Sequence, residues 1–252
     1  MNLIILERHE ISDTGDVTLA DGRAAHLLNV LHASPGHQVR VGVLDGPRGT
    51  ATVQSAGADS VGLRCAFEAG IPARPTIDLL LAVPRPKVMR RLWAQIAALG
   101  VGQIILTNAE KVERNYFDSH VLAADTYRPL LIEGLQQARD TRLPVVSVHR
   151  RFKVLLEDEL HALFPNGLRV VADPSGPRPL EDVVPSGDQE RTLLAIGPEG
   201  GWNAFELGLL AAHGFQPVGM GPRTLRTDTA CIALLAVAHS TRSSDFRRQI
   251  SD

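Results

Sequence analysis

Cysteine is scarce in this sequence, and metal-binding patterns are missing. Only Cys65 and Cys231 occur among 252 residues, and two cysteines so far apart form no disulfide framework. The nine histidines show no HxxxH spacing, and two cysteines give no zinc site. These absences favour a reducing cytoplasm and predict a protein without a bound metal.

Long hydrophobic runs are also missing. The N-terminal sequence MNLIILERHE has an apolar run of only four residues, which is too short for the core of a secretion signal. The longest apolar run near the C-terminus, residues 230–238, is about half of what a bilayer requires. We therefore expect a soluble protein with no membrane partner.

Three familiar ligand-binding and catalytic motifs are absent. The stretch Gly197-Pro198-Glu199-Gly200-Gly201 is not followed by Gly-Lys-Ser/Thr, so it is not a Walker loop, and it does not fit GxGxxG. No GxSxG nucleophile elbow occurs either. The usual sequence support is therefore missing for a nucleoside triphosphate site, a dinucleotide site or a serine hydrolase.

An excess of positive charge is lacking too, because the formal net charge is −2. A polyanionic partner would have to be met by local patches. Two basic clusters begin predicted helices: Arg85, Lys87, Arg90 and Arg91 in one, and His149, Arg150, Arg151 and Lys153 in the other. Cations at a helix start oppose the helix dipole, so these clusters fit either a solvated surface or a polyanion site.

The length of 252 residues fits two modest domains or one large one, and a content of 44% hydrophobic residues is enough for their cores. Residues 1–70 alternate in short strands around the turn at 45–49, and a short helix begins near Asp21, a plausible N-cap. Together they suggest a small β-barrel. The stretch 70–75 carries two prolines and a glycine and is typical of a linker.

From Thr76 onward, buried strands alternate with helices. The predicted strands are 77–83, 104–106, 145–148, 168–172, 193–196 and a short one near Val218. The predicted helices are about 88–99, 127–138, 153–164, 204–213 and 229–241. This alternation predicts an α/β domain with a mostly parallel sheet covered by helices.

Two glycine-rich turns stand where strands end and helices begin. The first is Gly197–Gly201 and the second starts at Gly221, and such turns leave backbone groups open to a ligand. We predict a small-ligand pocket there. Glu199 fits either a site residue at a strand end or a plain turn former, whereas Asn203 and Glu206 have the spacing of a capping box.

Charged residues surround the second turn. Arg223 and Arg226 could hold a phosphate or an RNA backbone, and Asp228 could stabilise the start of the last helix. Surface charge without a ligand is the simpler alternative. Both interpretations fit the residues alone.

The sequence IGPEGGW, followed by GPRTLRTDTA, resembles the RsmE family of small-subunit ribosomal RNA methyltransferases in the SPOUT superfamily. Supporting matches spread over nearly the whole chain. They are Ala98-Leu99-Gly100-Val101 for the family's ELGV, Arg142-Leu143-Pro144 for R-x-P, and His26-Leu27-Leu28-Asn29-Val30-Leu31 for HHL-x-x-VL.

The resemblance implies a PUA-like RNA-binding β-barrel over residues 1–71. It implies a trefoil-knotted SPOUT methyltransferase domain over residues 76–245, of the α/β class. The implied reaction is methyl transfer from S-adenosylmethionine to N3 of a uridine in 16S rRNA of the small ribosomal subunit. A homodimer with the site beside its interface is also implied.

We hypothesise that Arg226 orients the phosphate of the target or stabilises charge on the uracil, and that Glu199 is the catalytic base that takes the N3 proton. Asp228 would help to order the loop. Further residues are assigned to binding. The cofactor would be bound by Ile196, Gly197, Pro198, Glu199, Gly200, Gly201, Met220, Gly221, Leu225, Arg226, Thr227 and Ala230. RNA would be bound by Arg8, His26, Arg85, Lys87, Arg90, Arg91 and Arg223.

Several positions depart from the family pattern. They are His32, Gln95, Ala98, Asp140 and Asp228. The cofactor loops are kept while several implied RNA contacts differ. Two alternatives therefore stay open: a SPOUT methyltransferase of another rRNA or tRNA nucleotide, and a non-catalytic RNA-binding factor in ribosome assembly.

Overall fold

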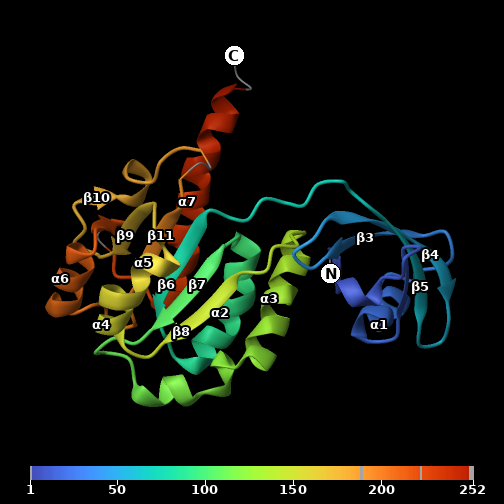
Figure 1. Ribbon diagram of the computed structural model, residues 1–252, viewed down its shortest axis with the longest axis horizontal. Coiled ribbons are helices and arrows are strands. Elements are labelled where there is room, and N and C mark those ends of the chain that lie inside the picture. The colour runs from blue at the N-terminus through green and yellow to red at the C-terminus, as the bar shows by residue number, and fades with distance from the viewer. Residues whose placement is uncertain (1, 188–189, 222, 250–252) are drawn as a thin grey trace. The chain divides into compact units, whose positions relative to one another are not determined.

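The computed structural model describes residues 2–187, 190–221 and 223–249, with side chains as far as Arg242. It divides into two compact units, each with its own sheet (Figure 1). The first comprises Met1–Arg74 and Ile132–Leu143, and the second comprises Pro75–Leu131 and Pro144–Asp252. The functional domains expected over 1–71 and 76–245 stay a prediction; the structure adds that residues 132–143 group with the N-terminal unit.

The first unit is built on a five-stranded sheet in the order β1-β3-β4-β5-β2. Its strands are β1 (Ile4–Leu6), β2 (Asp16–Leu19), β3 (Gln38–Val43), β4 (Arg48–Ala56) and β5 (Val61–Phe67). All pairs are antiparallel except β1 with β3. The sheet encloses an apolar core that includes the buried side chains of Leu6, Leu19, Leu27 and Leu63. The strands and turn predicted around 39–53 are confirmed, whereas the PUA-like barrel stays a prediction.

The predicted helix of this unit is α1 (Gly22–Asn29). Asp21 caps it, because its Oδ1 accepts a hydrogen bond from the Arg23 backbone N–H at 2.8 Å. The Arg23 guanidinium also forms ion pairs with Asp21 and Glu10. A single arginine thus ties the start of α1 to Glu10, which lies in the 3-10 turn before β2.

The second unit carries a seven-stranded, entirely parallel sheet in the order β10-β12-β9-β11-β6-β7-β8. Its strands are β6 (Ile77–Ala82), β7 (Gln103–Thr107), β8 (Val145–His149), β9 (Leu168–Ala172), β10 (Arg178–Pro179), β11 (Thr192–Ile196) and β12 (Phe215–Gly219). Every residue of β6 and β11 is buried, as expected of strands covered on both faces. The predicted α/β class is confirmed.

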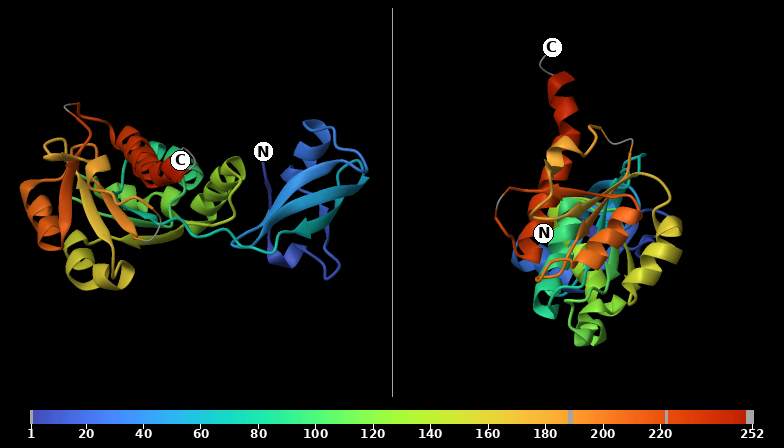
Figure 2. Two further views of the ribbon diagram at one scale, coloured as in Figure 1. Left: turned by 90° about the horizontal axis from the view of Figure 1, so that it is seen from above. Right: turned by 90° about the vertical axis from the view of Figure 1, so that its left-hand side faces the viewer.

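Helices cover both faces of this sheet (Figure 2). They are α2 (Pro86–Leu99), α6 (Ala204–Ala212), α7 (Thr227–Gln249) and the helical stretch over 152–163, while α3 (Ala124–Ala138) spans the division between the units. α2 ends where predicted, because Gly100 adopts the left-handed conformation at φ +86°. The strand order does not by itself establish the trefoil knot, which stays a prediction.

The prediction of a single helix over 153–164 is wrong in detail. The stretch consists of α4 (Phe152–Val154), a π-helical turn η4 (Leu155–Glu159) and α5 (Leu160–Leu163). The Leu160 N–H bonds to the Leu155 carbonyl, five residues back. Glu159 at the end of this turn contacts His149 Nδ1 at 2.5 Å, which ties the turn to β8.

The last helix begins two residues before its predicted start and extends beyond Thr241. α7 starts at Thr227, whose side chain is buried and whose hydroxyl donates to the Gly197 carbonyl at 3.3 Å. None of the helices in the described part of the chain is long and apolar enough to cross a bilayer.

A buried carboxyl group lies at the start of β6. Asp78 has no exposed surface, and its Oδ2 accepts a hydrogen bond from Arg191 Nε at 2.9 Å. Burial outweighs the attraction of Arg191 and raises the pKa of Asp78 to about 6. The folded state therefore holds this proton more tightly than the unfolded chain.

This raised pKa predicts a loss of stability with rising pH. Between the ordinary pKa of 3.8 and about 6, the folded state binds more protons, so the contribution of Asp78 is full below the lower value and lost above the upper. Relative to wild type, Asp78→Asn should gain up to about 3 kcal/mol in free energy of unfolding from pH 4 to pH 7. Urea unfolding at several pH values measures this, and parallel curves for the two proteins would contradict it.

Candidate functional site

A cavity of about 330 Å³ lies at the carboxyl ends of the neighbouring strands β12, β9 and β11. Its walls are residues 172–174, 196–202, 218–221 and 223–225, together with Leu207, Thr227, Ala230 and Leu234. Ligands of open α/β sheets bind outside the carboxyl ends of the strands. The volume is within the range of small-molecule sites.

The two glycine-rich loops meet in this cavity. All residues expected to bind a cofactor line it except Arg226: Ile196, Gly197, Pro198, Glu199, Gly200, Gly201, Met220, Gly221, Leu225, Thr227 and Ala230. The two glycine-rich loops, about two dozen residues apart in the sequence, therefore both line this one cavity. The role of these residues in binding a cofactor stays a prediction.

Glycine is required at two positions of these loops for different reasons. A Cβ at Gly197 would lie 3.2 Å from the backbone nitrogen and ring of Trp202, so a side chain there would displace Trp202. Gly221 has φ +89°, a conformation that side chains disfavour. The first glycine allows close packing and the second allows the turn.

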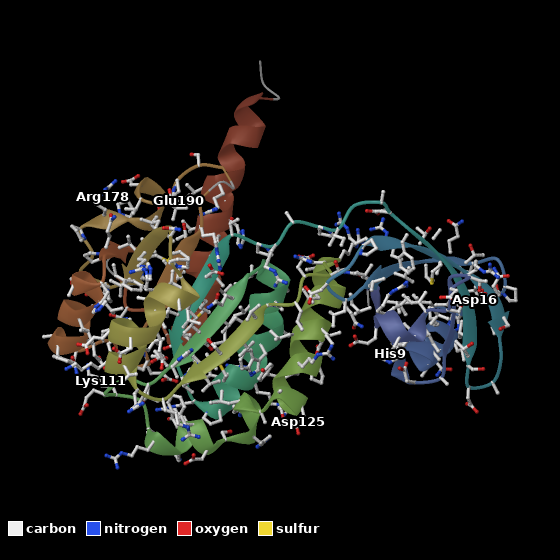
Figure 3. All side chains as sticks on the ribbon, in the orientation of Figure 1. His9, Asp16, Lys111, Asp125, Arg178 and Glu190 are labelled. Carbon is white, nitrogen blue, oxygen red and sulfur yellow. The ribbon has the colours of Figure 1, made fainter. Side chains whose placement is uncertain are left out.

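Lys111 and Asp173 were not predicted as site residues, and Lys111 holds the first loop. Its Nζ donates to the Gly200 carbonyl at 2.6 Å, and Figure 3 labels it in the second unit. Asp173 follows β9 and lines the cavity. The predicted strand 168–172 could have indicated Asp173, because parallel strands end at the same edge; nothing in the sequence marks Lys111.

Glu199 lines the cavity and also holds the start of α2. Its Oε1 accepts a hydrogen bond from the backbone N–H of Arg85 at 3.1 Å. Arg85 is the N-cap of α2, where helix N–H groups lack partners within the helix. The carboxylate therefore joins the first loop to α2 beside the cavity.

Arg226 lies outside the cavity lining, in an ionic cluster at the start of α7. Its guanidinium is 3.2 Å from Asp228 Oδ2, and Arg91 of α2 approaches the same oxygen at 3.1 Å. The side chain of Asp228 is only 17% exposed, whereas that of Arg226 is 70% exposed. Asp228 thus positions a largely exposed arginine beside the second loop.

The residues expected to bind RNA belong to both units. Arg85, Lys87, Arg90 and Arg91 are exposed near the start of α2, and Arg223 lines the cavity. In the first unit, Arg8 is exposed, while His26 is partly buried and its Nε2 has no hydrogen-bond partner among the described residues. Their role in RNA binding stays a prediction.

The capping box predicted at α6 is confirmed, and its Glu206 also binds the segment that follows β7. Glu206 Oε2 accepts from the Asn203 N–H at 2.8 Å, and its Oε1 accepts from the Glu110 N–H at 2.7 Å. Its side chain is buried. One carboxylate therefore fixes both the end of the first loop and the segment after β7 that carries Lys111.

Glu206→Ala is expected to lower the free energy of unfolding by about 2–4 kcal/mol, because two backbone N–H groups would lose a charged acceptor in a buried place. Glu206→Gln should cost less, since its amide keeps one acceptor. Urea unfolding gives the values, with the exposed Glu181→Ala as the matched control. A loss no greater in Glu206→Ala than in Glu181→Ala would contradict this account.

The two cysteines are poor nucleophiles. Burial raises the pKa of Cys65 to about 11 and also raises the pKa of the fully buried Cys231. Both thiols stay protonated near neutral pH. Within the described ranges, no group of three or more histidine, cysteine or acidic side chains is arranged to hold a metal ion.

Comparisons with known proteins agree with this geometry. Residues 72–239 match the model of the RNA methyltransferase domain family. The ribosomal RNA small subunit methyltransferase E of Treponema pallidum is 31% identical over 248 residues, covering 95% of this chain and 92% of that protein. Its Borreliella burgdorferi counterpart is 26% identical, with 95% and 98% covered.

The chain belongs to the ribosomal RNA small subunit methyltransferase E family. The match to the RNA methyltransferase domain covers residues 72–239, so the chain is an RNA methyltransferase. The Neisseria gonorrhoeae family member, solved bound to S-adenosyl methionine, has the same fold, with a TM-score of 0.76 at 21% identity over 95% of this chain and 97% of that one. A Legionella pneumophila methyltransferase solved with the same cofactor gives 0.75 at 23% identity, with 95% and 97% covered.

Proposed function

We propose that this chain transfers the methyl group of S-adenosylmethionine to N3 of a uridine in 16S rRNA of the small ribosomal subunit. The observation that carries the proposal is the cavity in which both glycine-rich loops meet. It lies within the residues that match the RNA methyltransferase domain. Relatives over nearly the whole length are named for small-subunit ribosomal RNA.

The residues of the cavity fit this cofactor. Ile196, Val218 and Leu234 give it a buried apolar side suited to a purine ring. Asp173 and Glu199 add carboxylates that suit ribose hydroxyls and the cationic groups of the ligand. The loop glycines have no side chains of their own to cover the wall, while the Gly197 and Gly200 carbonyls accept hydrogen bonds from Thr227 and Lys111. When bound, S-adenosylmethionine supplies an electrophilic methyl group on a sulfonium.

Two side chains are assigned to the reacting uridine. Formation of the bond between N3 and the methyl carbon would break the methyl–sulfur bond, with a neutral thioether as the leaving group. N3 must lose its proton in this step, and Glu199 at the cavity wall accepts that proton. Arg226 stabilises the negative charge that develops on the uracil ring. Since the substitution is an in-line displacement, alignment of N3 with the methyl group supplies most of the catalysis.

The target uridine must be unpaired, because N3 lies on the pairing edge of the base. The basic residues at the start of α2 contact the RNA backbone near the cavity. The N-terminal unit is a PUA-like RNA-binding domain, and two copies of the chain form a homodimer in the cytoplasm. Light scattering of the purified protein tests the dimer, and a monomer at micromolar concentration would contradict it.

The proposed reaction is tested with purified protein, deuterium-labelled S-adenosylmethionine and either small ribosomal subunits or free 16S rRNA. Mass spectrometry of the digested RNA should find labelled 3-methyluridine. Label in another nucleoside would show a different target. No bound cofactor by calorimetry and no label in either RNA would instead favour a non-catalytic assembly factor.

A further inference from the structure

A second cavity, of about 320 Å³, lies beyond the end of β7 and beside the start of α6. Its lining comes from three segments: 108–114 after β7, Phe152 and Lys153 of α4, and Asn203–Glu206 at the start of α6. It shares no lining residue with the first cavity. Nothing in the proposed methyl transfer uses these side chains.

An aromatic pair lies between the two cavities. Trp202 lines the first and Phe152 lines the second. Their rings are stacked, with centroids 5.2 Å apart. The cavities are therefore neighbours, and a ligand in the second cavity is held apart from the first by these two rings.

One rim of the second cavity offers an exposed aromatic ring. Phe205 follows the N-cap of α6 by two residues, and 64% of its surface is exposed. A single exposed apolar residue is ordinary on a protein surface. This ring, however, lines a hollow that also contains cations, and flat aromatic rings beside cations are the usual platform for an unpaired nucleobase.

The polar groups of the cavity suit the rest of a nucleotide. Asn108 lines the cavity, and its Oδ1 is buried without a hydrogen-bond partner among the described residues. A turn of this side chain toward the cavity lets it accept from a base N–H or amino group. Lys153, whose side chain is 64% exposed and 3.7 Å from Glu157, and the exposed Arg114 supply positive charge. Two carboxylates line the same cavity: the exposed Glu110, and Glu206, whose two oxygens already accept backbone N–H groups. Lysine and arginine side chains contact phosphates without reading sequence.

We propose that the second cavity binds a nucleotide flanking the methylated one in single-stranded RNA. Its base stacks on Phe205 and donates a hydrogen bond to Asn108, while Lys153 and Arg114 contact the phosphates of the RNA backbone. It is not the target nucleotide, because the stacked Trp202 and Phe152 rings lie between the two cavities. The inference rests on the proposed function for RNA as substrate and adds a site that positions this RNA.

Phe205→Ala tests the stacking. Alanine substitution of a stacking aromatic should weaken binding by about 5- to 100-fold. We expect that loss in the affinity for a fluorescein-labelled single-stranded fragment of 16S rRNA, and a matching rise in KM for RNA. The kcat and the affinity for S-adenosylmethionine should change less than threefold, roughly, because the site positions RNA only.

Phe205→Tyr keeps a ring and should bind RNA within about twofold of wild type. Val145→Ala is the matched control, since Val145 is 53% exposed on the edge strand β8 and lies in neither cavity. Unchanged RNA affinity and KM in Phe205→Ala would overturn the inference. Equal losses in Phe205→Ala and Val145→Ala would overturn it as well.

Lys153→Gln gives an independent measurement that does not depend on the ring. The slope of log affinity against log salt concentration should fall by about 0.7, as expected for one lost phosphate contact on a single strand. Arg178→Gln, at the opposite edge of the sheet, should leave the slope unchanged. Equal slopes in wild type and Lys153→Gln would remove the phosphate contact from the inference.

The proposed function and this inference fail in different ways. A wild-type protein that methylates RNA, with no effect of Phe205→Ala on RNA affinity or KM, would sink the inference alone. A wild-type protein that transfers no methyl group but binds the RNA fragment through Phe205 would sink the proposed reaction alone. A wild-type protein that does not bind the fragment at all would overturn the inference.

Discussion

Ala230→Trp is expected to abolish binding of S-adenosylmethionine, with a loss of affinity of at least about a hundredfold, or roughly 3 kcal/mol. Ala230 lies in the first turn of α7 and lines the cavity. A tryptophan at this position would fill the space between the two glycine-rich loops. Isothermal titration calorimetry of the purified variant measures the loss.

Two further variants separate a filled cavity from a damaged fold. Ala230→Ser adds one small polar atom and should bind within about tenfold of wild type. Ala211→Trp places the same bulk on an exposed residue of α6 that does not line the cavity, and it should bind like wild type. Undiminished binding to Ala230→Trp would place the cofactor elsewhere in the protein.

Arg226→Ala is expected to lower kcat for RNA methylation by roughly 10²- to 10³-fold, as when a group that stabilises transition-state charge is removed. Because Arg226 is largely exposed and lies outside the cavity lining, the affinity for S-adenosylmethionine should hold within about threefold. Single-turnover methylation with saturating cofactor measures the chemical step.

The controls for this prediction use the ionic cluster of Asp228. Arg226→Lys keeps the charge and should recover part of the rate. Asp228→Asn weakens the pairing that positions Arg226 and should cost less than Arg226→Ala. Methylation by Arg226→Ala at the wild-type rate would remove Arg226 from the mechanism. A large loss of cofactor affinity would assign it to cofactor binding instead.

Local signals in the sequence predicted the elements that frame the site. Asn203 and Glu206 have the spacing of a capping box, and α6 begins there. Gly100 ends α2 because its backbone is left-handed. The two glycine-rich turns follow strands of a parallel sheet, so both were expected at one edge of the sheet, where the structure places them. β11 before the first turn is buried throughout, whereas Gln216 and Pro217 of β12 before the second are exposed. In each case residues within one helical turn determine the conformation.

Features that depend on strand order could not be predicted. The alternation of strands and helices does not specify that β9 lies between β12 and β11, and this placement brings Asp173 to the cavity. Lys111 reaches Gly200 across 89 positions of sequence. The π-helical turn that ends at Glu159 was likewise missed, because apolar spacing does not distinguish a π turn from an α turn.

The most direct test of the account is the modified-nucleoside content of 16S rRNA from a strain that lacks this gene. If this chain methylates N3 of the uridine, 3-methyluridine should disappear, the wild-type gene should restore it, and a gene encoding Ala230→Trp should not. Unchanged 3-methyluridine in the deletion strain, together with loss of a different methylated nucleoside from rRNA or tRNA, would contradict this account.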